Sequence, residues 1–245
     1  MLAVGFVARV GHAEGVPAEV AAPAQAAPAT TTPADPPEPH ADRVVLTPTA
    51  YTHPRGTFFV SNYDLVLLQV GYAPTDRTQV SFTATPPIGE EDEARFAFLD
   101  LTLKSALVKD GPVRVAALGS MSGLAGDGIG LVMVGRAGAV VQLCLRAQCT
   151  SSLAISSNLA LLGPLMVLSN GVGAIFRVGR RVSILLEANT VIPIGREGGQ
   201  INAFAVGGGV RLHWRRFAAD LAILGGVGST DGVLPIVALT YRGLP

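Results

Sequence analysis

The sequence predicts an all-β fold, a transmembrane up-and-down antiparallel β-barrel of about 12 strands. Of its 245 residues, 49% are hydrophobic and only 15% are charged, whereas an ordinary soluble domain has about 25% charged residues. No run of about 18 uninterrupted apolar residues marks a spanning helix. The apolar residues fall instead into many short segments in which polar and apolar positions alternate, as a barrel wall between lipid and lumen requires.

The first 43 residues are expected to lie outside the barrel. Residues 1–13 are predicted to be the remnant of a signal peptide, because residues 2–8 are a short apolar core and residues 11–13 form a small-residue cleavage site. An apolar N-terminus without signal function is the alternative, since no basic region precedes the core. Residues 14–43 are rich in Ala, Pro, Glu and Thr and cannot bury enough apolar surface to order themselves. We expect a disordered linker there and the barrel in residues 44–245.

Short apolar segments separated by Gly, Pro, Asp and Arg fill the rest of the chain, which is typical of strands joined by turns. The alternation is clearest near the C-terminus, where Val210 and Leu212 take one parity and Arg211 and His213 take the other. An even number of strands keeps both termini on one side, so we expect twelve strands, with ten as the alternative. The predicted strands are residues 56–62, 65–73, 77–86, 94–107, 112–120, 129–144, 150–161, 165–177, 181–193, 201–214, 217–226 and 233–242.

Turn lengths predict the orientation of the barrel. Outer-membrane barrels have short periplasmic turns and longer extracellular loops. The connections predicted on the periplasmic side are short: residues 74–76, 109–112, 146–148, 179–180 and 215–216. Those predicted on the opposite side are generally longer and rich in Gly: residues 87–93, 123–128, 195–200 and 226–232. The expected location is therefore the cell outer membrane, with outer-membrane lipid and the barrel-assembly machinery as partners.

Several motifs resemble those of a known family. Thr47-Pro-Thr-Ala50, Pro54-Arg-Gly56, Asn62-Tyr63 and Gly71-Tyr-Ala-Pro-Thr-Asp-Arg77 are similar to the opening of outer-membrane β-barrel proteins predicted in many Gram-negative genomes. Residues 176–187 resemble a later hairpin of that group. The resemblance covers residues 44–242 and implies a barrel in the outer membrane. It brings no catalytic residues, because the family mostly lacks an assigned activity. The chain departs from the usual pattern at its end, where Arg242-Gly-Leu-Pro245 stands in place of a terminal aromatic residue.

The two cysteines, Cys144 and Cys149, flank a short predicted turn. Their spacing differs from the Cys-x2-Cys half of a zinc site, and no histidine lies nearby. We favour a disulfide formed in an oxidising compartment. Two free thiols are the alternative.

Charge and histidine content exclude some function classes. The 18 basic and 18 acidic residues balance, and no basic cluster is interleaved with aromatics, so nucleic-acid binding is not expected. No cofactor is expected either. A lipid-modifying barrel enzyme needs a Ser–His pair near the outer leaflet, but the barrel region holds only His53, before the first strand, and His213, at a predicted periplasmic strand end. The sequence therefore predicts a protein that is not an enzyme.

Charged residues of both signs occupy predicted interior positions. They could line a polar pore for small solutes, or pair with one another in a barrel filled by side chains. The leading hypothesis is passive passage or binding of a small, unidentified solute. A structural or adhesion-type surface protein is the alternative, and a lipid-modifying enzyme is less favoured. The predicted lumen-lining residues are Arg77, Asp100, Lys104, Arg114, Glu187, Arg211, Asp220 and Arg242.

Four aromatic residues stand at strand ends on the predicted periplasmic side. They are Tyr72, Trp214, Phe217 and Tyr241. Aromatic rings favour the headgroup level of a membrane. We expect an aromatic girdle there, with ordinary core aromatics as the alternative.

Overall fold

The computed structural model describes Glu38 and residues 40–86, 96–126, 130–162, 165–194, 203–228 and 232–243. The predicted signal segment, residues 1–13, and residues 14–37 of the predicted linker lie outside this range. In the described part of the chain no helix is long and apolar enough to cross a membrane.

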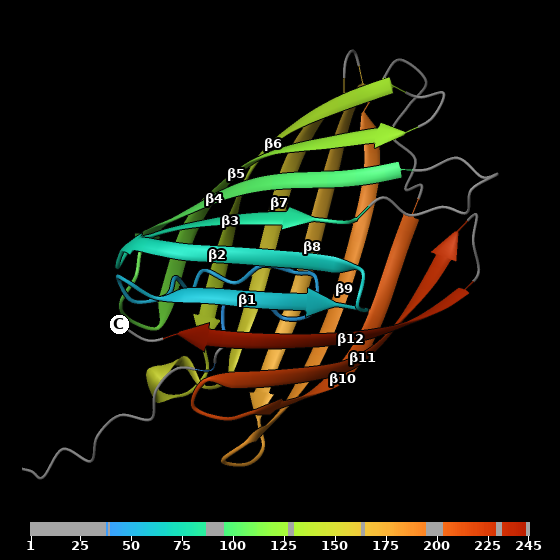
Figure 1. Cartoon of the computed structure of the whole chain (residues 1–245). Helices are drawn as coiled ribbons and strands as arrows, with labels where there is room; N and C mark the ends of the chain where they lie inside the picture. The colour runs from blue at the N-terminus through green and yellow to red at the C-terminus, as the bar shows by residue number, and fades with distance from the viewer. Residues whose placement is uncertain are drawn as a thin grey trace, which may run out of the picture. The chain divides into compact units, whose positions relative to one another are not determined.

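Twelve antiparallel strands close into a barrel in which every strand pairs with its sequence neighbours and β1 pairs with β12 (Figure 1). The predicted fold class and strand number are therefore confirmed. A 3-10 helix, η1 (Ala147–Cys149), lies between β6 and β7. The strands are β1 (Phe58–Tyr63), β2 (Leu67–Thr75), β3 (Thr78–Ala84), β4 (Phe96–Val108), β5 (Val113–Gly126), β6 (Gly130–Cys144), β7 (Ser152–Leu162), β8 (Leu165–Arg177), β9 (Val182–Ile194), β10 (Ala203–His213), β11 (Phe217–Gly228) and β12 (Gly232–Gly243).

The barrel wall is apolar outside and polar inside. On β10, Val210 is 41% exposed on the outer surface, whereas its neighbour Arg211 is fully buried in the interior. The largest fully buried side chains are Arg211 and Arg242, while large Leu, Ile, Val and Phe side chains are exposed on every strand. Successive strand residues point to opposite faces, so this arrangement follows directly from the period-2 alternation. The outer surface is one that lipid, and not water, would cover.

The longest connection, residues 85–95, lies at one end of the barrel, which we call the loop end, and short connections occur at both ends. The short-turn end carries the connections at residues 76–77, 109–112, 145–151, 178–181 and 214–216, and the loop end carries the other connections. The four predicted girdle aromatics are exposed beside the short-turn end. Within this group, the rings of Trp214 and Phe217 lie 5.7 Å apart. The predicted loop at residues 123–128 is wrong, because β5 continues to Gly126 and only residues 127–129 separate it from β6.

A segment before β1 folds back into the barrel, where Figure 1 shows it as a blue coil between the strands. We call residues 40–53 the inner hairpin. Arg43 and Pro48 form an isolated antiparallel bridge. At the tip of the inner hairpin, the Val44 amide donates to the Thr47 carbonyl (2.8 Å), and the Thr49 amide donates to the Asp42 carbonyl (2.9 Å). The inner hairpin thus enters at the short-turn end, turns inside the lumen and returns to β1.

The inner hairpin corrects the predicted linker boundary. Glu38, His40 and Asp42 fall within the predicted linker, yet all three are buried inside the barrel. The polar groups of this segment form hydrogen bonds with the barrel wall. These bonds order the segment, and its amino-acid composition alone does not predict them. The wall also makes room for it: a Cβ on Gly173 of β8 would lie 2.5 Å from Val44, so only glycine allows this approach.

Candidate functional site

Six of the predicted lumen-lining residues are buried inside the barrel: Asp100, Lys104, Glu187, Arg211, Asp220 and Arg242. Arg114 is half-buried near the start of β5. Arg77 differs from the prediction, because it is exposed in the turn between β2 and β3. The strand register shifts between Tyr72 and Thr75, and this irregularity takes Arg77 out of the alternation that placed it inside.

Arg211 on β10 joins the wall to the inner hairpin. Its Nε and Nη2 donate to the two carboxylate oxygens of Asp220 on β11 (2.7 and 2.8 Å), a bidentate pair of the strong kind. The same guanidinium donates to the backbone carbonyls of His40 (2.8 Å) and Val44 (2.5 Å). Arg211 therefore donates hydrogen bonds to one carboxylate of the wall and to the backbone of the inner hairpin.

His40 completes this cluster. Its Nδ1 lies 2.8 Å from an Asp220 carboxylate oxygen and its Nε2 lies 3.0 Å from the Tyr63 hydroxyl. Burial lowers the pKa of His40 in spite of the nearby Asp220 charge. The neutral ring therefore donates from Nδ1 to the carboxylate and accepts at Nε2 from the Tyr63 hydroxyl.

Glu187 on β9 holds the tip of the inner hairpin. Its carboxylate accepts from the backbone amides of Val45 (3.1 Å), Leu46 (3.0 Å) and Thr47 (3.0 Å). Asn189, two residues further on the same face of β9, donates to Glu187 Oε1 (3.0 Å). Three successive amides that converge on one carboxylate fix the turn, because a buried amide without a partner is costly.

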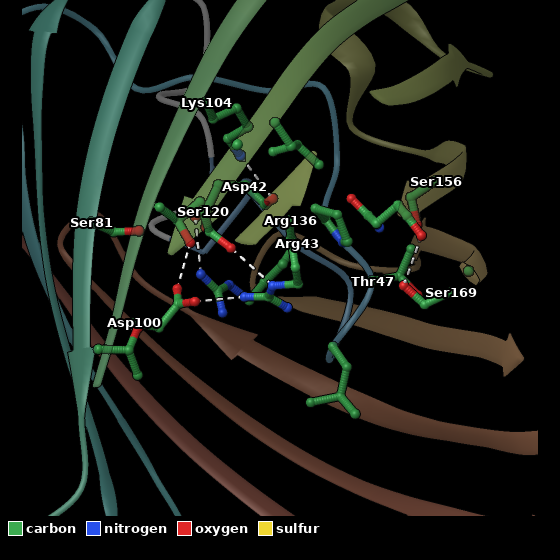
Figure 2. A pocket seen from close by; sticks show the side chains of 18 of the residues that line it. Asp42, Arg43, Thr47, Ser81, Asp100, Lys104, Ser120, Arg136, Ser156 and Ser169 are labelled. Atoms are coloured by element: carbon green, nitrogen blue, oxygen red, sulfur yellow. Dashed lines mark hydrogen bonds and ion pairs between the residues drawn. The ribbon is translucent and has the colours of Figure 1, made fainter. Parts of the chain in front are cut away.

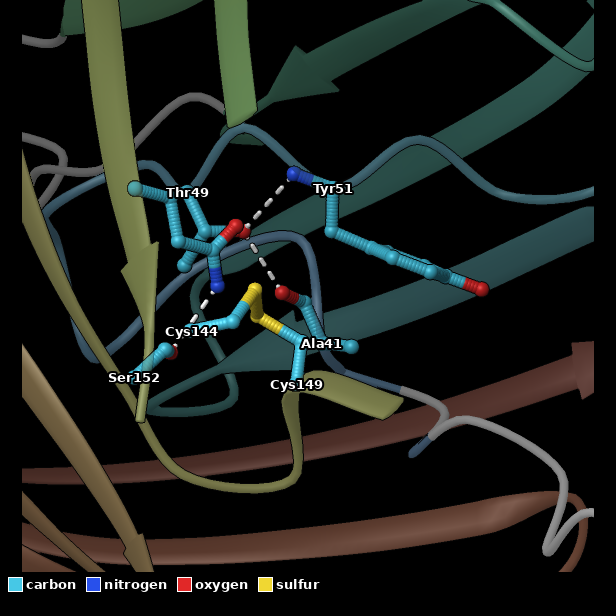
Figure 3. The surroundings of a disulfide bond; sticks show 7 residues. Ala41, Thr49, Tyr51, Cys144, Cys149 and Ser152 are labelled. Atoms are coloured by element: carbon cyan, nitrogen blue, oxygen red, sulfur yellow. Dashed lines mark hydrogen bonds between the residues drawn. A yellow bond between two sulfur atoms is a disulfide. The ribbon is translucent and has the colours of Figure 1, made fainter. Parts of the chain in front are cut away.

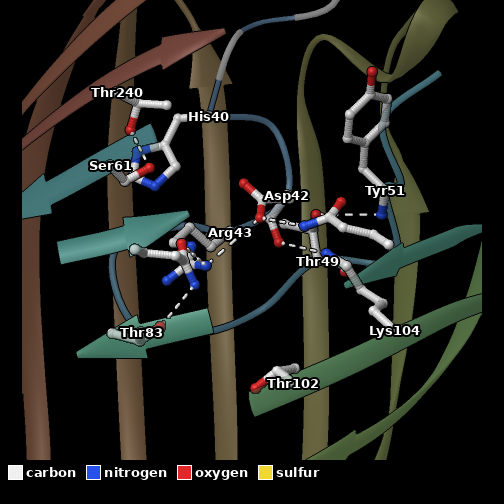
Figure 4. A network of polar contacts seen from close by, with 12 residues as sticks. His40, Asp42, Arg43, Thr49, Tyr51, Ser61, Thr83, Thr102, Lys104 and Thr240 are labelled. Atoms are coloured by element: carbon white, nitrogen blue, oxygen red, sulfur yellow. Dashed lines mark hydrogen bonds and ion pairs between the residues drawn. The ribbon is translucent and has the colours of Figure 1, made fainter. Parts of the chain in front are cut away.

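On the opposite wall, Asp42 and Arg43 of the inner hairpin meet β2, β3 and β4 (Figure 4). Gln79 Nε2 donates to Asp42 (3.1 Å), Lys104 Nζ donates to the Asp42 carbonyl (3.1 Å), and Arg43 donates to Gln69 Oε1 (2.7 Å). Burial alone would raise the pKa of Asp42, but the charges of Arg43 and Lys104 outweigh it and hold that pKa well below its usual range. The inner hairpin is thus bonded on both sides of the lumen.

A cavity of about 530 Å³ lies between the inner hairpin and the loop end (Figure 2). Asp42, Arg43 and Leu46 of the inner hairpin line its floor. Most of its wall residues, on β2 to β9, have polar side chains, and Leu67, Phe98, Leu118 and Val191 are among the apolar ones. The polar wall residues are Gln69, Gln79, Ser81, Thr83, Asp100, Thr102, Lys104, Ser120, Arg136, Ser156, Asn158, Ser169, Asn170, Asn189 and Thr190.

Arg136 and Asp100 form the main ion pair of the cavity wall. Arg136 Nη2 lies 2.6 Å from Asp100 Oδ1, and Arg136 Nε donates to Ser120 (2.8 Å). Ser122 and Thr102 also donate to the Asp100 carboxylate. Figure 2 shows the Arg136 and Arg43 side chains close together beside the cavity. The Arg136 side chain is 43% exposed, so this charge is available to a solute.

The histidines form no catalytic arrangement in the part of the chain that the structure describes. His213 Nε2 lies 3.2 Å from Glu38 at the short-turn end. Both ring nitrogens of buried His53 are without a partner, and none of the three described histidines bonds to a serine. The described residues contain no group of three His, Cys, Asp or Glu side chains that could hold a metal.

A disulfide joins Cys144 and Cys149, whose Cα atoms lie 4.6 Å apart, as the sequence led us to expect. It closes the connection from β6 to η1 at the short-turn end. Ala41, Thr49 and Tyr51 of the inner hairpin lie around it (Figure 3). Thr49 Oγ1 donates to the Ala41 carbonyl there (2.6 Å), so the disulfide borders the base of the inner hairpin.

Sequence reasoning missed Arg136 and the charged residues of the inner hairpin. Arg136 has the same strand parity as Gln142, which is buried on β6, so alternation alone could have placed it inside. The inner hairpin offers no such alternation. The one available signal was the charged run His40-Ala-Asp42-Arg43 directly before the barrel.

Comparison with known proteins supports the fold. No family model matches the sequence, and no curated protein matches it. The KdgM porin in complex with disordered oligogalacturonate is similar in structure with a TM-score of 0.52 and 9% identity, over 76% of this chain and 96% of that one. The KdgM porin alone gives 0.51 and 10%, over the same shares of the two chains. The fold is that of an outer-membrane β-barrel protein.

A weaker likeness, with a TM-score of 0.47 and 12% identity, is to LpxR from Salmonella typhimurium, over 78% of this chain and all of that one. At identities this low, the likeness to these outer-membrane barrels concerns the fold alone. The function has to be argued from the interior of this barrel.

Proposed function

We propose that the protein is an integral outer-membrane barrel that binds a small polar solute in the cavity and lets it pass when the inner hairpin moves. The observation that carries this proposal is a cavity lined mainly by polar residues, with the inner hairpin as its floor. A volume of about 530 Å³ falls within the roughly 300 to 1,000 Å³ of small-molecule sites. Its hydroxyl and amide groups suit a polyhydroxylated solute.

The charges of the cavity favour a solute of low net charge. Arg43, Lys104 and Arg136 stand against Asp42 and Asp100, so the formal balance is three positive charges against two negative ones. Four of these five already pair with each other, Arg43 with Asp42 and Arg136 with Asp100. A solute would then be held mainly by neutral hydrogen bonds, each of about 1 kcal/mol.

The interior supports a role other than catalysis. Barrel-embedded hydrolysis requires a nucleophile activated by an adjacent base. Among the described histidines, His40 bonds instead to Asp220 and Tyr63, His213 lies beside Glu38, and His53 lacks a partner. We therefore propose a protein that is not an enzyme.

Conductance through planar lipid bilayers tests the passage. We expect the full chain to stay mostly closed and Glu187→Gln to open more often, because the side-chain amide is neutral and places a donor where Oε1 now accepts from Asn189. Asp110→Asn, which removes an exposed carboxylate at the short-turn end, is the matched control and is expected to behave as the unsubstituted protein does. If Glu187→Gln conducts no more than the control, the inner hairpin is a fixed part of a structural surface protein and passage is rejected.

Block of the open current by sucrose tests the cavity. Sucrose serves as the neutral probe and sodium glucuronate as the anionic one. We expect sucrose to lower the current of Glu187→Gln, and Arg136→Gln in the same background to weaken the block by a few-fold. An equal effect of sucrose with and without Arg136 would show that the cavity wall does not bind the solute.

A further inference from the structure

Two arginines at the short-turn end lack the partners that the other interior cations have. Arg43, Lys104, Arg136 and Arg211 all bond to carboxylates or carbonyls. Within the described ranges, neither Arg242 nor Arg114 forms an ion pair. Arg242 is 1% exposed, and the one hydrogen bond of its side chain to a described residue runs from Nη2 to the Arg215 carbonyl (3.2 Å).

Three donor atoms of these arginines are buried and unused. Arg242 Nε and Nη1 and Arg114 Nε are all inaccessible and without a hydrogen-bond partner. A buried charge that is neither paired nor hydrogen-bonded is costly, and such groups call for a partner of opposite charge or for ordered water. The two arginines stand at the short-turn ends of β12 and β5.

Tyr51 and His53 stand at the base of the inner hairpin, before β1. The Tyr51 hydroxyl and both His53 nitrogens are buried without a partner, as is the Thr57 hydroxyl beside β1. The Tyr51 and His53 rings meet edge to face with centroids 5.3 Å apart, and His53 lies 5.0 Å from Phe59. Phe59 is the cross-strand partner of Arg242. One end of the lumen therefore gathers unused donors from two arginines, a phenol and a hydroxyl.

The electrostatics agree with this geometry. Burial raises the pKa of Tyr51 to about 12, and the positive charges of Arg242 and Arg114 both act on its phenol. Burial also lowers the pKa of His53 to about 3, and Arg242 adds to that effect. Tyr51 therefore remains a neutral hydrogen-bond donor within electrostatic reach of both guanidinium groups.

We propose that Arg242, Arg114 and Tyr51 form a site for a small oxyanion, a phosphate or carboxylate group, at the short-turn end of the barrel. Guanidinium groups provide paired donors that match such anions. This site lies on the opposite side of the inner hairpin from the cavity. It stands independently of whether the cavity binds or passes a solute.

Calorimetric titration of the full chain, folded in detergent, with inorganic phosphate and with sodium acetate tests the site. We expect saturable binding of one or both anions. Arg114→Gln and Arg242→Gln should each weaken it about tenfold or more, the effect of losing one charge-assisted hydrogen bond. Tyr51→Phe should weaken it less. Arg180→Gln, which removes a charge from an exposed turn at the same end, is the matched control and should leave binding unchanged.

Three results would overturn the proposal. Absence of saturable binding means that water or another part of the chain satisfies these donors. An equal loss of affinity in Arg180→Gln means that the anion responds only to the overall positive charge at this end of the barrel. Undiminished binding in Arg114→Gln and Tyr51→Phe places the anion elsewhere. Unchanged gel mobility on boiling would show that Arg242→Gln fails to fold. In that case the titrations of Arg114→Gln and Tyr51→Phe test the proposal.

Discussion

Two Arg–Asp pairs of the described barrel wall face the interior, and they differ in what covers them. Arg211–Asp220 is 0% and 1% exposed, whereas Arg136–Asp100 is 43% and 8% exposed. Both are made by inward side chains of the wall with nearly equal distances, 2.7 and 2.6 Å. The inner hairpin lies against the first pair, and the cavity opens beside the second. The inner hairpin therefore divides the lumen into a solid part, where charges are structural, and a hollow part, where charge is free to meet a solute.

The largest expected effect is on the free energy of unfolding, and it distinguishes the two pairs. Arg211→Met leaves the buried Asp220 carboxylate with His40 as its one remaining side-chain partner among the described residues and removes the donors to the inner hairpin, so the free energy of unfolding should fall by about 3 to 5 kcal/mol. Arg136→Met breaks a part-exposed pair and should cost about 0 to 1 kcal/mol. Urea unfolding in lipid vesicles, followed by the fluorescence of the single tryptophan, Trp214, measures both.

Asp220→Leu combined with Arg211→Met is the control for this pair. Replacing both charges should restore part of the loss, because no isolated charge stays buried. Equal costs for Arg211→Met and Arg136→Met would mean that the inner hairpin does not change the environment of the wall pairs. The contrast between the two parts of the lumen would then be lost.

The outer face provides the next test. Val210→Arg places a charge in lipid beside Arg211 and should cost about 2 to 4 kcal/mol if the position is near the bilayer midplane. Val210→Leu keeps the surface apolar and should cost little. Parity alone suggests that the inward substitution is the mild one, but the Arg211 contacts reverse that expectation. A harmless Val210→Arg, measured by the same unfolding experiment, would place this part of β10 outside the lipid.

The sequence predicted the strands of the barrel wall well and the inner hairpin within the lumen poorly, for a physical reason. A strand that separates lipid from lumen must alternate, so twelve strands and the inward direction of Glu187 and Arg211 could be predicted locally. The inner hairpin follows no period, because its order comes from Glu187, Arg211 and Lys104, which are far away in sequence. Arg77 was misplaced because the alternation was continued through an irregular turn. The loop expected at residues 123–128 was wrong because Gly123 and Gly126 lie within β5.

Removal of the disulfide tests whether the stability of the protein depends on the cross-linked turn beside the base of the inner hairpin. Replacing both Cys144 and Cys149 by Ser removes a cross-link that closes a short loop, and chain entropy sets its contribution at about 2 kcal/mol. We expect that loss in the unfolding experiment while the barrel still folds. Mass spectrometry of unreduced peptides verifies the link first. Two alkylatable thiols in protein isolated from the membrane would contradict it.

The smallest expected effect is a pH dependence that comes from inside the solid part of the lumen. Burial lowers the pKa of His53 from 6.5 to about 3, helped by the positive charges of Arg242 and Lys104 and opposed by Asp42. The folded protein therefore keeps His53 neutral, while the unfolded chain binds a proton below about pH 6.5. Because the unfolded state binds more protons, stability falls as the pH drops from about 6.5 toward 3.

Between about pH 7 and about pH 5.5 this single histidine should remove about 1 kcal/mol from the free energy of unfolding. His53→Asn, which cannot titrate, should show a shallower fall over the same interval. The fall should persist in part, because burial lowers the pKa of His40 as well. An identical pH dependence in the two proteins would mean that His53 is solvated or protonated in the folded state. The solid part of the lumen would then be open to water at the base of the inner hairpin, and the contrast with the cavity would be one of degree.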